Sequence, residues 1–253
     1  MPLGALLWDM DGTLVDSEEL HRLAFNQAFA QAGLELRWGR REYRDLLAVA
    51  GGRERIRHAL AARPDLCAQA ARLDLAALHR RKTRIFGALL AGATTLRPGV
   101  ARLLRQAEAA GLRQAIVTTT SAANVDILLG THLRAVDVRF AAMVTGEDVA
   151  AKKPAPHAHL LALARLGLES DDCLALEDSG NGLAAARAAG IPTLVTWNAY
   201  TEEDDFCGAL GVLDHLGEPG KPCRQRSGTP LGGPCVNLED LRAWHGSLPR
   251  AAG

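Results

Sequence analysis

Two aspartates directly behind the first apolar segment are the residues of this chain most suited to chemistry. Asp9 and Asp11 follow the apolar run 3–7, and Gly12 and Thr13 complete the pattern Asp-x-Asp-Gly-Thr. Two carboxylates this close repel each other, and a hard cation used in phosphoryl chemistry is the usual reason to keep such a pair. A tight glycine turn also lets backbone groups approach a bound anion. The pattern therefore indicates a cation site that handles phosphate.

Three further polar groups stand where predicted strands end or a helix begins. The run Thr118–Ser121 follows an apolar strand, Lys152–Pro154 precedes a helix, and Glu177–Ser179 follows the strand 173–176. Carboxylates bind Mg²⁺, whereas hydroxyl, backbone N–H and ammonium groups bind phosphate oxygens. Each group alone is more often a solvated turn, a helix start or a surface lysine. Because parallel strands end at one edge of a sheet, the four groups together favour one shared site.

The order of predicted elements indicates an α/β fold with a doubly wound parallel sheet and a Rossmann-like core. Strand and helix patterns alternate from residue 97 onward, whereas residues 16–93 show helical spacing without a convincing strand. We therefore expect a core formed by 1–15 and 94–253 with an inserted α-helical cap over 16–93. Residues 16–19 are expected to cap the first helix, and 217–234 to form a long surface loop.

The overall composition limits the classes of function. The 253 residues contain 29 Lys and Arg and 29 Asp and Glu, and this zero net charge argues against a dedicated nucleic-acid binder. Residues 37–84, however, contain 13 basic and 5 acidic side chains. This excess suits an anionic ligand, although a solvated helical surface rich in arginine is the more common explanation of such a count. The five cysteines show no Cys-x-x-Cys spacing, so we expect free thiols and a cytoplasmic location. We also expect a monomer. No apolar run is long enough to predict a membrane span.

These motifs resemble the haloacid dehalogenase superfamily of aspartyl-phosphate phosphotransferases over nearly the whole chain. Asp-x-Asp-Gly-Thr matches its first motif, Thr118 its second, Lys153-Pro154 its third and Glu177-Asp178 its fourth. The inserted helical region matches the α-helical cap that follows the first motif. The second aspartate argues against a true dehalogenase, because members that cleave carbon–halogen bonds lack it.

The resemblance implies a division of tasks within one Mg²⁺ site. Asp9 would attack phosphorus, and Asp11 would protonate the leaving group and later activate water. Mg²⁺ would be held by the Asp9 carboxylate, the Asp11 backbone carbonyl and Asp178, with Glu177 supporting its water shell. The resemblance assigns the phosphoryl oxygens to three further groups, which are Thr118, the Thr119 N–H and Lys153.

Three segments are distinctive, namely the cap stretch 43–56, Lys82-Thr83 and the segment 213–219. They resemble the CbbY-type phosphatases, which remove the 1-phosphate of xylulose-1,5-bisphosphate. That compound is a misfire product of the Calvin cycle and inhibits Rubisco. Glu18 and His21 would lie beside the sugar hydroxyls and the transferring group. The distal phosphate or sugar would be held by a cap set consisting of Tyr43, Gly52, Arg53, Arg55 and Lys82. The paired glycines allow backbone approach, and the arginines can grip an anion bidentately.

Two other functions are compatible with the same sequence. A beta-phosphoglucomutase shares the cap type and the core motifs, and differs by protecting its phospho-aspartate from water. A non-catalytic sugar-phosphate-binding protein could use the same fold, although it would not need both Asp9 and Asp11. A phosphonatase is disfavoured because the cap shows no lysine placed for a Schiff base. Phosphate release, compared with isomerisation of beta-glucose 1-phosphate, distinguishes the two enzymes.

Overall fold

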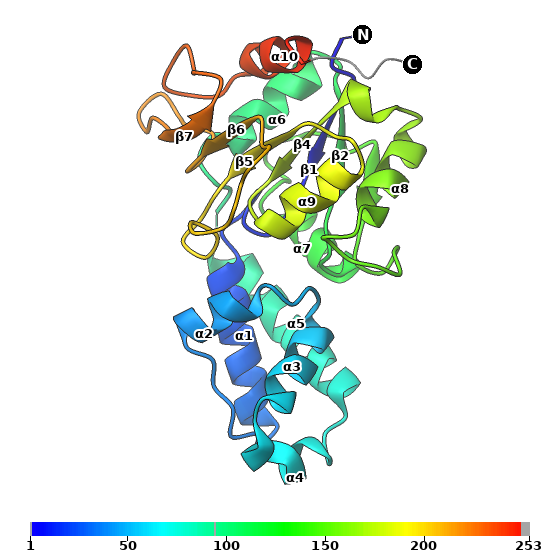
Figure 1. Ribbon diagram of the computed structural model, residues 1–253, viewed down its shortest axis with the longest axis vertical. Coiled ribbons are helices and arrows are strands. Elements are labelled where there is room, and N and C mark those ends of the chain that lie inside the picture. Colours follow the sequence, from blue (N-terminus) through cyan, green and yellow to red (C-terminus); the bar gives the residue numbers. More distant parts are fainter. Residues whose placement is uncertain (1, 94, 249–253) are drawn as a thin grey trace.

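The computed structural model describes residues 2–93 and 95–248 and shows a sheet flanked by helices with a helical unit below it (Figure 1). The predicted core ranges include residues 1, 94 and 249–253, which lie outside this described part. None of the helices described has the length and apolar content needed to cross a membrane. The five cysteines are all unpaired.

A seven-stranded sheet organises the core in the order β3-β2-β1-β4-β5-β6-β7. Strands β1 to β6 are parallel, and β7 is antiparallel to β6, so the predicted doubly wound parallel sheet is confirmed. Because β1 lies in the interior between β2 and β4, the loops after these three strands are neighbours. The strands are Ala5–Trp8 (β1), Arg113–Val117 (β2), Ala142–Val144 (β3), Cys173–Glu177 (β4), Thr193–Thr196 (β5), Gly211–Leu213 (β6) and Gln225–Gly228 (β7).

Alternate residues of β1 supply two separate apolar layers. Leu6 and Trp8 pack with helices α6, α7 and α10 on one face, whereas Ala5 and Leu7 pack with α8 and α9 on the other. This pattern follows from the period of two in a strand that is buried on both faces. The core helices are Val100–Ala109 (α6), Ala122–Thr131 (α7), His157–Leu166 (α8), Gly180–Ala188 (α9) and Leu238–Gly246 (α10), with a 3-10 turn over Ser170–Asp172.

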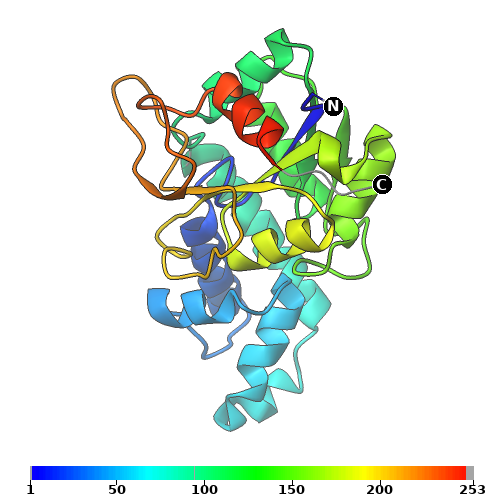
Figure 2. The same ribbon diagram turned by 45° about the horizontal axis from the view of Figure 1, so that its top comes forward.

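The helical unit has its own aromatic cluster. Phe25, Phe29, Trp38 and Tyr43 pack together, with Phe25 and Trp38 ring centroids 4.7 Å apart. The long helices α1 and α5 run beside each other and connect this unit to the sheet (Figure 2). The elements of the unit are Glu18–Gln31 (α1), Arg40–Leu46 (α2), Gly52–Ala61 (α3), Pro64–Leu66 (a 3-10 turn), Cys67–Ala70 (α4) and Leu75–Ala93 (α5).

Two local predictions were wrong. The predicted cap over 16–19, with Asp16 three residues before Glu19, is displaced by one residue, because the N-cap of α1 is Ser17. The Ser17 side chain makes no capping hydrogen bond and donates to Asp11. The segment 217–234 is not simply a loop, because it contains β7, which pairs with β6 at the edge of the sheet. The short strand β6 had also been missed. A three-residue strand gives too little alternation to detect, and β7 is mostly exposed and polar.

Candidate active site

The loop after β1 presents Asp9 and Asp11 at the carboxyl edge of the sheet. The N–H of Asp9 still pairs with the carbonyl of Leu176 at 2.9 Å, so β4 fixes the point where the chain leaves the sheet. Gly12 then turns the chain with a φ of +83°. A side chain at this position would be strained, and its Cβ would lie 2.0 Å from Asp178 Oδ2. Glycine therefore allows the loop to approach Asp178.

Lys153 connects the carboxyl ends of three neighbouring strands. Its Nζ donates to Asp9 Oδ1 at 2.6 Å, to Glu177 Oε1 at 2.7 Å and to the Val117 carbonyl at 2.8 Å. Burial alone would lower the pKa of Lys153, but Asp9 and Glu177 raise it above its ordinary value. Lys153 is therefore a fixed cation beside the carboxylate of Asp9.

Asp9, Glu177 and Asp178 form a compact group of buried acids. Each offers a carboxylate oxygen, and these oxygens lie within 4.8 Å of one another. Burial raises the pKa of Asp9 to about 8 against the opposing charge of Lys153. Burial, followed by the charge of Asp9, raises the pKa of Asp178 well above its ordinary value. Crowded oxygen ligands of this kind are relieved by a hard cation, so the donor set fits Mg²⁺.

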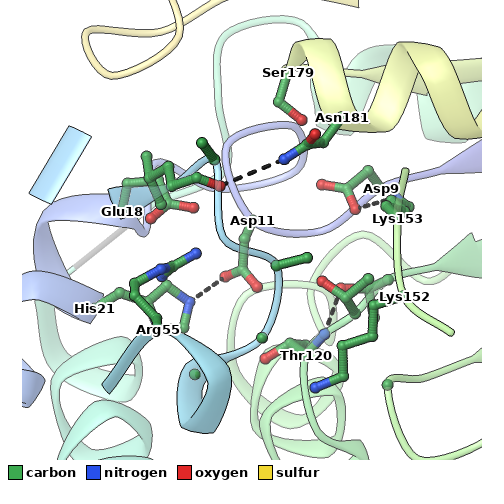
Figure 3. A pocket seen from close by; sticks show the side chains of 18 of the residues that line it. Asp9, Asp11, Glu18, His21, Arg55, Thr120, Lys152, Lys153, Ser179 and Asn181 are labelled. Atoms are coloured by element: carbon green, nitrogen blue, oxygen red, sulfur yellow. Dashed lines mark hydrogen bonds and ion pairs between the residues drawn. The ribbon is translucent and has the colours of Figure 1, made fainter. Parts of the chain in front are cut away.

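Asp11 is embedded in a chain of contacts that reaches the helical unit (Figure 3). Its Oδ1 accepts from Ser17 Oγ at 2.5 Å and lies 3.0 Å from His21 Nε2. His21 Nδ1 contacts Lys82 Nζ, and the His21 ring stacks on Phe86 at a centroid distance of 3.7 Å. Burial would raise the pKa of Asp11, but His21 and Ser17 lower it. Burial lowers the pKa of Lys82 to about 7.

The loop after β2 faces Lys153 with hydroxyl and backbone groups. Thr118 is buried, and its Oγ1 accepts the N–H of Thr120 at 3.1 Å. Thr119 lies against Gly146, where a Cβ would come within 2.2 Å of the Thr119 carbonyl oxygen. This close packing fixes the path of the loop. Thr118 and Thr119 both line the cleft and could donate to an anion there.

A cleft of about 1010 Å³ separates the sheet edge from the helical unit. Its volume is in the range of small-molecule sites. Figure 3 shows carboxylates and basic groups projecting into it from both sides. The structure brings thirteen of the fourteen predicted site residues to its wall, which are Asp9, Asp11, Glu18, His21, Gly52, Arg53, Arg55, Lys82, Thr118, Thr119, Lys153, Glu177 and Asp178.

Tyr43 is the predicted site residue that does not line this cleft. It is fully buried, and its hydroxyl donates to Glu18 Oε2 at 3.2 Å and accepts from Arg55 Nη1 at 3.0 Å. Arg55 also donates to the carbonyls of Leu46 and Val49 at 3.0 and 3.2 Å. The predicted direct contact between Tyr43 and the substrate therefore disagrees with the position of Tyr43, which is buried and does not line the cleft. Tyr43 supports Glu18 and Arg55 from behind, because its ring belongs to the aromatic cluster.

The wall opposite the acids is basic. Arg53 is exposed at the start of α3, and within residues 2–93 and 95–248 no hydrogen bond or ion pair engages it. A Cβ on Gly52 would lie 2.5 Å from His79 Nε2, so glycine lets the chain pack on that ring. His79 and Arg80 line the same wall, although they had not been predicted as site residues. Lys152, which belongs to the predicted group 152–154, lines the cleft from the core side.

Two polar residues that sequence reasoning missed contact the acids from behind. Asn198 Nδ2 donates to Asp178 Oδ2 at 2.7 Å, and His159 Nε2 lies 3.1 Å from Glu177 Oε1. His159 shares the apolar face of α8 with Leu163, and a histidine at such a position is a weak signal of a buried partner. Asn198 gives no comparable signal, because it follows β5 in a polar loop.

The comparisons with known proteins agree with this geometry. A family described as haloacid dehalogenase-like hydrolase matches residues 3–190. The plasmid-encoded protein CbbY of Cupriavidus necator is 49% identical over 245 residues, covering 95% of this chain and 96% of that protein. CbbY from Rhodobacter sphaeroides has been solved with phosphate and, as a mutant, with xylulose-(1,5)bisphosphate. Both structures are 43% identical to this chain with a TM-score of 0.77, covering 85% of it and 95% of theirs.

All four sequence motifs fall inside the matched range, and their side chains meet at one edge of the sheet. The similarity to the CbbY proteins also extends over the helical unit, since it covers 95% of the chain. The chain therefore belongs to the haloacid dehalogenase-like hydrolases and is a sugar-phosphate phosphatase of the CbbY type.

Proposed function

We propose that this protein is a Mg²⁺-dependent phosphatase that converts xylulose-1,5-bisphosphate to xylulose 5-phosphate through a phospho-aspartate. The main support is the CbbY structure with xylulose-(1,5)bisphosphate, whose sequence is 43% identical over 85% of this chain. The acid group beneath the cleft and the basic wall opposite it support the same assignment. A role beside the Calvin cycle follows from this substrate.

In the first step, an Asp9 oxygen forms a bond to phosphorus while the bond from phosphorus to the sugar oxygen breaks. Asp11 gives its proton to that departing oxygen. Its lowered pKa keeps Asp11 ionised in the free site, but an arriving dianion raises the pKa of a neighbouring carboxyl and favours proton uptake. Lys153 and Thr118 would hold the phosphoryl oxygens during the transfer.

In the second step, Asp11 removes a proton from water as the water oxygen bonds to phosphorus. The bond between phosphorus and the Asp9 oxygen breaks and releases phosphate. Asp9, Asp178 and the Asp11 carbonyl would hold Mg²⁺, with Glu177 on its water shell, and the cation would compensate charge on the phosphoryl oxygens. Splitting the reaction in two lets Asp11 serve first as acid and then as base.

The distal phosphate is assigned to the basic wall of the helical unit. Arg53 has no hydrogen bond or ion pair among the described residues, and its planar guanidinium group suits bidentate binding of a phosphate. Lys152 lies across the cleft from it, with Nζ 4.0 Å from Glu54 Oε2. A second phosphate would replace Glu54 as the partner of Lys152 and would give Arg53 a partner. Glu18 and His21, nearer the catalytic loop, are assigned to the sugar.

We also propose that the protein acts as a cytoplasmic monomer on this small molecule, without nucleic acid or a membrane surface. Its balanced charge and five unpaired cysteines support that view. Light scattering coupled to size exclusion tests the monomer. A stable dimer at micromolar concentration would contradict it.

A substrate panel tests the proposed function. Phosphate release with and without Mg²⁺ is measured for xylulose-1,5-bisphosphate, fructose 1-phosphate, phosphoglycolate and beta-glucose 1-phosphate. We expect the highest kcat/KM for the pentulose bisphosphate, and turnover that is lost with a chelator. Isomerisation of beta-glucose 1-phosphate without phosphate release would identify a mutase. Binding without any turnover would identify a sugar-phosphate-binding protein.

A further inference from the structure

We propose that Asn198 is a positioning residue that orients Asp178 for Mg²⁺, an inference that rests on the proposed Mg²⁺-dependent function. Asn198 follows β5 and stands beside β4, at whose end Asp178 lies. Its Nδ2 donates to Asp178 Oδ2 at 2.7 Å. Asp178 is 4% exposed, so water cannot easily take over this hydrogen bond. Asn198 is the neutral donor that contacts the carboxylate of Asp178.

The orientation of the Asn198 amide is determined by its other contacts. Its Oδ1 accepts the backbone N–H of Tyr200 at 2.8 Å, so only the Nδ2 side can face the carboxylate. The Asn198 N–H donates to Thr201 Oγ1 at 3.1 Å. The amide nitrogen, the amide oxygen and the backbone N–H of Asn198 therefore all make hydrogen bonds. A side chain held in this way can fix the rotation of Asp178 before any cation arrives.

The loop that carries Asn198 is itself held on several sides. The Trp197 N–H donates to the Leu213 carbonyl at 2.9 Å, and the Trp197 carbonyl accepts from Arg97 Nη2 at 2.8 Å. The guanidinium carbons of Arg224 and Arg226 lie 5.8 and 4.9 Å from the Trp197 ring centroid. Arg224 precedes β7 and Arg226 belongs to it, so both lie in the segment 217–234 that was predicted as a surface loop. This segment therefore has a structural role. It covers the residue next to Asn198.

The hydrogen bond from Asn198 holds one oxygen of the Asp178 carboxylate and so restricts how this side chain can be presented to the cation. Asp178 Oδ2 is held by Asn198, and a Cβ on Gly12 would meet both Oδ2 at 2.0 Å and Asn198 Nδ2 at 2.7 Å. The carboxylate therefore has little freedom to turn toward Gly12. A neutral amide orients a ligand without competing with the cation for its charge. Removal of such outer contacts typically weakens metal binding by about 10- to 100-fold.

The test uses the full-length protein and Mg²⁺ alone. Asn198→Leu keeps the size and branching of the side chain but has no donor, and Asn198→Ala tests the same loss if the leucine variant does not fold. Circular dichroism checks the fold, and Mg²⁺ binding is measured by calorimetry and by the rise of the melting temperature. We expect the Mg²⁺ Kd to rise about 10- to 100-fold. Turnover should recover at saturating Mg²⁺, because Asn198 touches no reacting atom.

Thr201→Ala is the matched control. It removes the acceptor of the Asn198 N–H and loosens the same loop, but it leaves the contact between Asn198 and Asp178 in place. We expect its Mg²⁺ Kd to stay within about twofold of the wild-type value, well inside the change predicted for Asn198. Unchanged Mg²⁺ binding in both Asn198 variants, or equal weakening by Thr201→Ala, would overturn the positioning role. Failure of the wild-type protein to bind Mg²⁺ would instead reject the proposed function itself.

Discussion

Gly182 provides a test of how closely the acid group must be placed. A Cβ on Gly182 would lie 1.9 Å from Glu177 Oε2, whereas ordinary contact begins at 3.4 Å. In Gly182→Ala the carboxylate must therefore retreat by about 1.5 Å. That movement separates Glu177 Oε1 from Lys153 Nζ, which is now 2.7 Å away. A misplacement of about 1 Å can cost roughly 100-fold in rate, or about 2.7 kcal/mol of transition-state stabilisation.

The variant should remain folded. Gly182 is in the first turn of α9, and alanine favours helix by up to about 1 kcal/mol relative to glycine. Gly130→Ala is the matched control, because Gly130 is in α7 and has nothing within 4 Å of its Cβ position. We expect kcat/KM to fall about 100-fold for Gly182→Ala and to change less than twofold for Gly130→Ala.

Turnover of p-nitrophenyl phosphate, titrated with Mg²⁺, together with thermal unfolding, measures both effects. Gly182→Ala should keep a melting temperature close to that of the wild-type protein while losing activity. Wild-type turnover in this variant would refute the reasoning, because the Glu177 carboxylate would then be free to move without consequence. A large loss of stability would also contradict it, since the clash would then be absorbed by the fold instead of by the carboxylate.

Three further outcomes are expected. Asp9→Asn should abolish aryl phosphate turnover while circular dichroism shows an intact fold, and residual activity near the wild-type value would reject Asp9 as the nucleophile. Arg53→Ala should raise KM about tenfold or more for a bisphosphate but little for a monophosphate, whereas Arg57→Ala, on the exposed side of α3, should change neither. A hydrogen bond from Arg22 is the main reason that the pKa of Glu19 is lowered to about 2, so this pair stabilises the fold above pH 4.5 and loses its effect as the pH falls toward 2. Urea unfolding gives the free energy of unfolding of the wild-type protein and of Glu19→Gln. The difference between these two free energies should be smaller at pH 3 than at pH 7.

The catalytic edge of the sheet was predictable because its chemistry follows local rules. Asp9 and Asp178 each follow a short apolar strand, and parallel strands end on one edge whatever the intervening sequence. Lys153 was predictable for a similar reason, since it stands just before a helix that returns to that edge. The sequence therefore indicated which groups would meet, although it did not give their distances.

Residues whose role depends on distant partners could not be predicted in this way. Tyr43 was expected to touch the substrate, but its ring is needed by the aromatic cluster, and that packing is a tertiary property. Residues 16–19 were expected to cap α1, with Asp16 first and Glu19 three residues later, but the N-cap is Ser17 and its hydroxyl donates to Asp11, a partner that local spacing does not reveal. Asn198 reaches Asp178 only because β5 lies beside β4, which a polar loop does not reveal.

The insertion point of the helical unit links its position to the protonation of Asp11. The two connecting segments pair with each other between Val15 and Leu96, directly behind the catalytic loop. Helices α1 and α5 start and end near this junction and bring His21 and Lys82 to Asp11. Separation of the helical unit from the sheet would remove the His21 contact, which lowers the pKa of Asp11 against the effect of burial. The position of the helical unit is therefore coupled to the pKa of Asp11 through the contact with His21.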